Sequence, residues 1–389
     1  MEEQDKSKFE ANPFSSMFEK IEDKRNPKLV HYPLSEILFL LFIGTLCGCD
    51  QLTIMIVFGE EKLDWFKKYY PYKHGMPSHD TLSKALGMIG KKEFEKIFMS
   101  WVFMHFGIQS SDVQICFDGK RLNGSADKLD QNKKRNEGGQ YAEIIVNVYA
   151  NAAGLILAQN NVSDKMDEIR GALELLDWLE IEGCCISGDA NFCRDNIVTK
   201  IVEKKGKYLL TLKGHLPKIL NATKKVFEKE DVAKSNFETE ETGHGRYEKR
   251  KYRAIAAKDI PTIALDYFEE LSQIVEVKRV RIVQRTGKKN EETHYYVTNS
   301  TEEVEQLAHK IRGHWAIENN LHHTLDVSFG EDGSRVRLKN AASNLSLIRK
   351  ATLNLLTKHP DKGSIKSKRL RLAISDKKRT DILSNIMMR

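Results

Sequence analysis

Three acidic residues, Asp118, Asp189 and Glu318, lie in sequence contexts where their carboxylates could be accessible to a ligand. Asp118 and Asp189 each follow a short apolar run and precede a small residue, Gly119 or Ala190, as is expected where ligands bind beyond the ends of strands. Hard oxygen ligands of this kind suit Mg²⁺, with Mn²⁺ as the alternative ion. Because a lone Asp before Gly is more often a turn residue, the surrounding elements must decide between a metal site and a turn.

The elements around the two aspartates predict an α/β core. The first strand is followed by two β-rich runs joined by a tight turn, and then by alternating helices and strands in a β-β-β-α-β-α-β order. The expected strands are 113–118, 141–151, 154–162, 184–190 and 207–213, and the expected helices are 165–180 and 192–206. This order is that of ribonuclease-H-like folds, in which a right-handed crossover makes the first and fourth strands parallel neighbours. The carboxylates of Asp118 and Asp189, at the ends of those strands, should therefore converge.

A long helix over residues 301–329 is expected to carry the third carboxylate. On it His314, Glu318 and His322 fall one turn apart on one face. Taken alone, Glu318 would be an ordinary solvated helix residue. Residues 214–300, which precede this helix, contain no second βαβ unit but several strand-like runs, so we expect a β-rich insertion that splits the core.

The first 110 residues favour an all-α module. The apolar run from Ile37 to Phe58 is interrupted by polar residues and glycines, which predicts a buried helical hairpin rather than a membrane span. Further along, Phe94, Phe98, Trp101 and Met104 recur at helical spacing and are expected to be core residues.

Charge and cysteine usage indicate a cytoplasmic protein with a basic end. The six cysteines show no C-x-x-C pairing and the N-terminus is charged, which fits a reducing cytosol. The net charge of the chain is +7, and residues 358–389 hold ten Lys or Arg against three Asp, which is also +7. This basic tail could be a solvated, disordered end or a segment that contacts phosphates.

Several motifs in consecutive order resemble those of H-repeat-associated insertion-sequence transposases of the DDE type. They are PSHDTLSKAL, FDGKRLNGS, ISGDANFCRDNIV, KYLLTLKGH, GHGRYEKR and RGHWAIENNLHHTLDVSFGEDGSR. They span about residues 25 to 355, and the HWAIEN to LDVSFGED block is the most specific. The resemblance implies that Asp118, Asp189 and Glu318 are the catalytic triad and that the region between Lys213 and Ser300 is the insertion.

The chain departs from the pattern of related cut-and-paste transposases around the glutamate. Those proteins carry a Tyr, Arg, Glu, Lys signature, whereas the corresponding positions here are Ile311, His314, Glu318 and Leu325. The role of the arginine would pass to Arg312 or His314.

Together these observations predict a five-part enzyme that acts on double-stranded DNA. Residues 1–110 would bind transposon ends, 111–213 and 301–357 would form the two parts of the catalytic core, 214–300 the insertion and 358–389 the basic tail. Two magnesium ions bridged by Asp118 would support cleavage and strand transfer at terminal inverted repeats and target DNA. A homodimer assembled on DNA, with no membrane contact, would process two ends. The expected phosphate contacts are Lys120, Arg121, Lys213, Arg246, Arg312, His314, Arg335 and Arg337.

Three other functions are weighed against this one. A ribonuclease-H-like nuclease without strand transfer would use the same carboxylates, and an inactive DNA-binding relic would have no use for an intact triad. A zinc enzyme built from His314, His322 and His323 lacks the spacing that zinc sites show.

Overall fold

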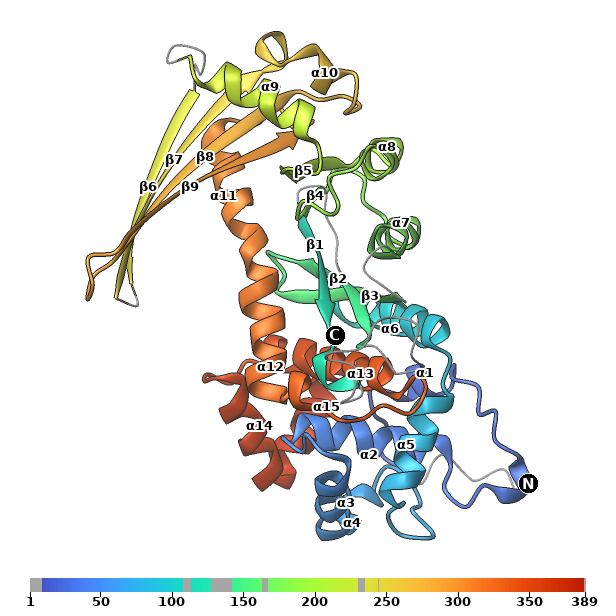
Figure 1. The fold of residues 1–389 in the computed structure, drawn as a ribbon. Helices are drawn as coiled ribbons and strands as arrows, with labels where there is room; N and C mark the ends of the chain where they lie inside the picture. Colours follow the sequence, from blue (N-terminus) through green and yellow to red (C-terminus); the bar gives the residue numbers. More distant parts are fainter. Residues whose placement is uncertain are drawn as a thin grey trace.

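A single mixed β-sheet runs through the protein and helices cover both of its faces (Figure 1). The computed structural model describes residues 9–107, 113–126, 142–162, 167–229, 235–243 and 245–387. The expected boundary at residue 110, the start of the expected helix at Lys165 and His244 of the GHGRYEKR motif lie outside these residues. The sheet has nine strands in the order β3-β2-β1-β4-β5-β9-β8-β7-β6.

The first five strands confirm the expected order of elements. Strands β1, β2 and β3 form an antiparallel meander, and β1, β4 and β5 run parallel. The bounds are β1 (Gln114–Arg121), β2 (Ile144–Ala150), β3 (Leu155–Val162), α7 (Glu168–Trp178), β4 (Cys185–Gly188), α8 (Asp195–Glu203) and β5 (Lys207–Leu212). Strands buried on both faces are rich in apolar residues, as the runs in these segments are.

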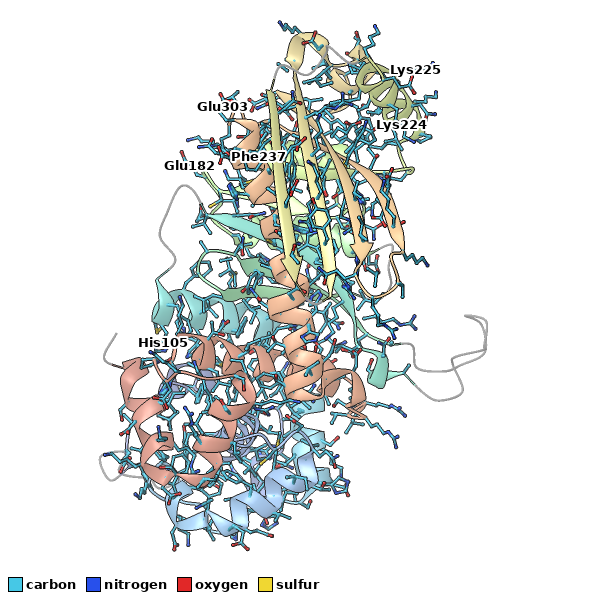
Figure 2. The ribbon with its side chains drawn as sticks, turned by 90° about the vertical axis from the view of Figure 1, so that its left-hand side faces the viewer. His105, Glu182, Lys224, Lys225, Phe237 and Glu303 are labelled. Atoms are coloured by element: carbon cyan, nitrogen blue, oxygen red, sulfur yellow. The ribbon has the colours of Figure 1, made fainter. Side chains whose placement is uncertain are left out.

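The β-rich region expected at 214–300 extends the same sheet. Its elements are α9 (Pro217–Phe227), β6 (Ser235–Gly243), β7 (Arg246–Ala256), α10 (Thr262–Leu265), β8 (Gln273–Val283) and β9 (Lys289–Thr298). Strand β9 pairs antiparallel with β5, from Leu209 with Thr298 to Leu212 with Tyr295. This pairing satisfies the backbone groups that β5 would otherwise leave open at a sheet edge. Exposed Lys224 and Lys225 on α9 lie at the end of the sheet remote from the helical module (Figure 2).

Different helices cover the two faces of the sheet. Helices α7 and α8 pack on one face, where α7 contacts β2 and β3 and α8 contacts β5. On the other face α11 (Val304–Ala316) contacts β1, β4, β6 and β7 (Figure 1). At the far end of this face Phe237 of β6 lies against α11, with its ring 5.9 Å from that of His309 (Figure 2). The strand order brings β1 and β4 under α11, and this arrangement positions the candidate site.

The helical module is built around α13 (Ala341–Lys358), which lies between the N-terminal helices and β3. The N-terminal helices are α1 (Ser15–Phe18), α2 (Leu34–Leu46), α3 (Leu52–Glu61), α4 (Leu63–Phe66), α5 (His79–Met88) and α6 (Lys91–Phe106). Helices α2 and α3 confirm the predicted hairpin, and no helix in the described part of the chain is long and apolar enough to cross a membrane. Core positions were correct for Phe94, Phe98 and Trp101 but wrong for Met104, which is 57% exposed near the end of α6.

Residues 358–389, described as far as residue 387, are not the solvated, disordered end that was one of the two interpretations of the basic tail. They form α14 (Ile365–Ile374) and α15 (Asp376–Met387), which pack on the helical module. Two of the arginines in this segment, Arg369 and Arg379, are buried. The Arg379 guanidinium lies 4.5 Å from the ring of Trp65, which itself donates a hydrogen bond to Thr380. Part of the basic charge therefore holds the fold together.

Candidate active site

Strand register places the two aspartates beside each other. Strands β1 and β4 pair in parallel up to Phe117 and Gly188, so that Asp118 and Asp189 are the next residues on the two strands. Asp189 directly follows β4, as expected. Asp118 does not end its strand, because β1 continues to Arg121 through its pairing with β2. Asp118 nevertheless lies where the parallel pairing of β1 with β4 stops, one residue beyond the last pair, as Asp189 does on β4.

Glu318 lies on the long helix, as predicted, within a local π-helical segment. Helix α11 continues through a π-helix, η7 (Ile317–His322), into α12 (His323–Phe329). A π segment carries one extra residue per turn, and such segments are frequent at functional sites. Here it carries both Glu318 and His322, and it lies against β1.

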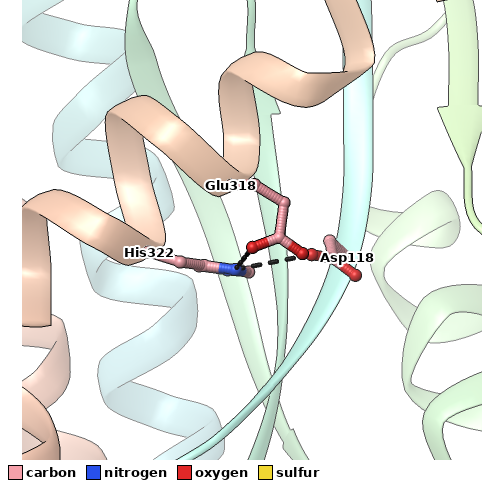
Figure 3. A group of neighbouring side chains, drawn as sticks. All are labelled: Asp118, Glu318 and His322. Carbon is pink, nitrogen blue, oxygen red and sulfur yellow. Dashed lines mark ion pairs between the residues drawn. The ribbon is translucent and has the colours of Figure 1, made fainter. Parts of the chain in front are cut away.

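His322 joins Asp118 and Glu318 into one cluster (Figure 3). Its Nδ1 lies 3.4 Å from Asp118 Oδ2 and 3.5 Å from Glu318 Oε2. Its Nε2 accepts a hydrogen bond from the buried Asn147 amide at 3.2 Å, which leaves Nδ1 as the donor to the two carboxylates. The sequence placed His322 on the face of Glu318, but its spacing of one turn carried no sign that the ring would reach Asp118.

The carboxylates of the cluster affect one another's pKa values. Burial, and then the negative charges of Glu318 and Asp189, raise the pKa of Asp118 well above its usual range. The hydrogen bond from His322 lowers the pKa of Glu318 to about 2. A divalent cation bound here would relieve the repulsion between the carboxylates.

The donor atoms of this cluster fit a metal ion. Ligand atoms of Asp118, Glu318 and His322 all lie within 4.8 Å of one another, and Asp118 and His322 are buried. Within the described residues, this grouping includes neither His314 nor His323, so it does not reproduce the three-histidine zinc site considered from the sequence. The two carboxylates suit Mg²⁺ or Mn²⁺, and the imidazole of His322 serves as their hydrogen-bond donor.

His314 occupies a buried position beside the cluster. Its Nδ1 lies 3.0 Å from Ser187 Oγ, and burial lowers the pKa of the imidazole to about 4. The ring is therefore neutral near pH 7, which does not favour the phosphate contact expected from the sequence. The other departures from the family signature, Ile311 and Leu325, are core residues.

Lys120, also expected to contact phosphate, points into the protein. Side chains two residues apart on a strand share a face, so Lys120 lies under the same helices as Asp118. Its ammonium group pairs with Asp326, and with Glu331 at 3.0 Å. Burial lowers the pKa of Lys120, but these carboxylates outweigh the effect and raise it. This charge is thus used to hold β1 to the segment that follows Glu318.

The remaining basic candidates differ in their surroundings. Arg312 forms an ion pair with Glu241 at 3.2 Å, and Arg337 donates to the carbonyl of Gly124 at 3.0 Å. The exposed candidates lie on four different segments of the chain. They are Arg121 at the end of β1, Lys213 after β5, Arg246 at the start of β7 and Arg335 beyond α12.

Comparison with known proteins places the chain in a family. Residues 109–355 match the family model described as "Transposase DDE domain", and residues 15–102 match the one described as "DDE_Tnp_1-associated". "Putative transposase YncI" of Escherichia coli O157:H7 is 34% identical over 366 residues, which cover 91% of this chain and 90% of the relative. "H repeat-associated putative transposase YhhI" of Escherichia coli K12 is 31% identical, covering 87% of this chain and 88% of the relative.

A short relative has a different description. "Inactive transposase YbfQ" of Escherichia coli K12 is 36% identical over 59 residues, which are 15% of this chain and 69% of the relative. The family models, which together span both the helical module and the sheet, and the long match to YncI agree with the motifs read from the sequence. The chain therefore belongs to the family of DDE transposases, and within it resembles the H-repeat-associated members.

Proposed function

We propose that this DNA transposase cleaves and joins DNA with Asp118, Asp189 and Glu318 as its metal-binding catalytic triad. The observation that carries the proposal is the convergence of Asp118, Glu318 and His322 from a central strand and a facing helix. The strand register supports the addition of Asp189, whose negative charge also raises the pKa of Asp118.

The residues of the chain have distinct roles in this mechanism. Two divalent cations, Mg²⁺ or Mn²⁺, would supply charge neutralisation and activation of the attacking oxygen in phosphoryl transfer. Asp118, Asp189 and Glu318 would hold the ions. His322 orients both Asp118 and Glu318 through its Nδ1 and is itself held by Asn147.

We assign the catalytic core to a ribonuclease-H-like fold split by the 214–300 insertion. The support is the order β3-β2-β1-β4-β5, with β1 and β4 parallel, and the return of the chain through β9 to α11. We assign residues 1–110 to binding of transposon ends.

The proposed substrates are the terminal inverted repeats of an insertion sequence and its target DNA, both double-stranded. Exposed Arg121, Lys213, Arg246 and Arg335 are the proposed phosphate contacts. One active site per chain and two DNA ends favour a homodimer assembled on DNA, working in the bacterial cytoplasm at the nucleoid.

The triad is tested by replacing each carboxylate with its amide. Asp118→Asn, Asp189→Asn and Glu318→Gln should each abolish cleavage, because the amide keeps the shape but removes the negative charge that binds the cation. Cleavage and joining of labelled end DNA are measured, together with DNA binding and thermal unfolding. Glu305→Gln, an exposed position on α11, is the matched control and should leave activity unchanged.

The same assays discriminate between the functions. Wild-type rates in any of the three triad variants would remove that residue from the site. Cleavage without any joined product would favour the nuclease, and binding without cleavage by the unaltered chain would favour the inactive relic.

A further inference from the structure

A buried carboxylate outside the proposed triad, that of Glu168, contacts residues close in sequence to the two aspartates. Glu168 begins α7 and is buried on the face of the sheet that α7 and α8 cover. Its Oε2 accepts a hydrogen bond from the Asn191 side-chain amide at 2.6 Å. On its other side Glu168 abuts Gly119, where an added Cβ would lie only 2.8 Å from Oε1. One carboxylate thus contacts Gly119, directly after Asp118, and Asn191, two residues after Asp189.

Each of these contacts leads directly to a proposed metal ligand. The Asn191 backbone N–H donates to Asp189 Oδ1 at 2.9 Å, and the Gly119 backbone N–H donates to Asp118 Oδ1 at 2.9 Å. Glu168 therefore holds the side chain of a residue whose backbone orients Asp189. It also packs against the peptide that orients Asp118.

We propose that Glu168 is a positioning residue that fixes the carboxylate of Asp189 through Asn191. The proposal rests on the metal-binding triad proposed above. The 2.6 Å hydrogen bond that the Glu168 carboxylate accepts from the Asn191 side chain can hold the Asn191 loop in one conformation. Partners that orient metal ligands in this way commonly contribute 10- to 100-fold to metal affinity.

Gly119 is part of the same arrangement. Without a side chain, it lets the Glu168 carboxylate approach β1 beside Asp118. An alanine at this position would force that carboxylate away, and with it the amide of Asn191. Substitution at Gly119 should therefore act through Glu168.

The test is Mn²⁺ binding to the full-length protein without DNA, measured as free Mn²⁺ by electron paramagnetic resonance. Glu168→Ala should weaken Mn²⁺ binding by about tenfold or more. Glu168→Gln should stay within about threefold of the unaltered protein, because its amide oxygen still accepts from Asn191. Asp177→Ala, which removes an exposed carboxylate from the same helix, is the matched control and should bind Mn²⁺ normally.

Two further variants connect the effect to the proposed route. Asn191→Ala should weaken binding as much as Glu168→Ala, and the double variant should be no weaker than either single one. Gly119→Ala should weaken Mn²⁺ binding in the unaltered background but have little further effect beside Glu168→Ala. Unfolding temperature is followed in parallel. Weaker Mn²⁺ binding by Glu168→Ala at an unchanged unfolding temperature supports the positioning role, whereas a loss that only accompanies a lower unfolding temperature overturns it.

Failure of this proposal can be told from failure of the triad. Asp189→Asn should itself abolish tight Mn²⁺ binding, and if it does not, the proposed metal site is wrong. If Asp189→Asn loses the ion while Glu168→Ala keeps it, the positioning role is overturned. Equal losses in Glu168→Gln and Glu168→Ala would also overturn it, because the charge and not the hydrogen bond to Asn191 would then matter.

Discussion

Arg369 is expected to be among the most important single side chains for the stability of the helical module. Its guanidinium donates to the carbonyl of Thr45 at the end of α2 and to the carbonyl of Ser328 at the end of α12, and it pairs with Asp50. It also lies 4.1 Å from the ring of Phe329. One buried cation thus joins α14, the N-terminal hairpin and the helix that carries Glu318.

Arg369→Ala should lower the free energy of unfolding by about 3 kcal/mol. Removing one partner of a buried, hydrogen-bonded charge typically costs about 3–5 kcal/mol. The lower figure applies because the side chain of Asp50 is 34% exposed and water can partly replace its lost partner. The carbonyls of Thr45 and Ser328 lose donors that bring charge, which accounts for most of the effect.

Urea denaturation of the full chain, followed by tryptophan fluorescence, measures this loss. Lys366→Ala is the matched control, because it removes an equal charge from an exposed position on α14 and should change stability by less than about 0.5 kcal/mol. DNA affinity should keep its salt dependence in Arg369→Ala, since this guanidinium is engaged within the protein. A loss in stability below about 1 kcal/mol would refute the structural role of Arg369. A shallower salt dependence at unchanged stability would show that Arg369 contacts DNA instead.

Three other outcomes are expected. The pKa of buried Glu331 is lowered to about 2, because neighbouring cations, Lys120 first, outweigh the effect of burial. Ionised Glu331 therefore stabilises the folded protein by about 3 kcal/mol at pH values above its ordinary pKa of 4.5, and this stabilisation is lost as the pH falls toward 2. The urea midpoint of Glu331→Gln should therefore change less with pH over this range than that of the unaltered protein. Gly87→Ala should destabilise by about 1–3 kcal/mol, since its Cβ would meet the Leu338 carbonyl at 2.7 Å, and an unchanged thermal midpoint would argue against that contact. An oligomer should cleave paired transposon ends, with its size measured by light scattering and its cleavage rate by kinetics on one-ended and paired substrates. A monomer that cuts a single end at full rate would contradict two-ended assembly.

Local patterns in the sequence were sufficient to predict most of the helices and strands. The apolar run after Ile37 reads as a buried hairpin and forms α2 and α3, because its length and its interruptions suit a helix pair. Strand-forming runs predicted β1 to β5 in the right order, and β-rich runs predicted strands before α11. Helical period alone could not show that Met104 lies beyond the core, since exposure depends on what covers the last turn of α6.

The candidate site illustrates what depends on distant contacts. Asp118, Asp189 and Glu318 could be selected from strand ends, helix period and family motifs, because these are properties of short segments. Their partners could not: His322 reaches Asp118 only through the packing of η7 on β1, and Lys120 is neutralised by acidic residues more than 200 positions away. The identity of a basic residue does not reveal whether its charged group is exposed to solvent or paired with a buried carboxylate.

The sequence by itself determined the family and the order of most strands and helices, because these depend on patterns of a few residues. It also selected the three carboxylates of the proposed triad. Tertiary structure decided that β6 to β9 extend the core sheet and that residues 365–387 form helices docked on the N-terminal module. It also decided that Glu168 lies between Gly119 and the Asn191 side chain. These features depend on which surfaces meet after the chain has folded, because burial and hydrogen-bond partners are set by residues far apart along it.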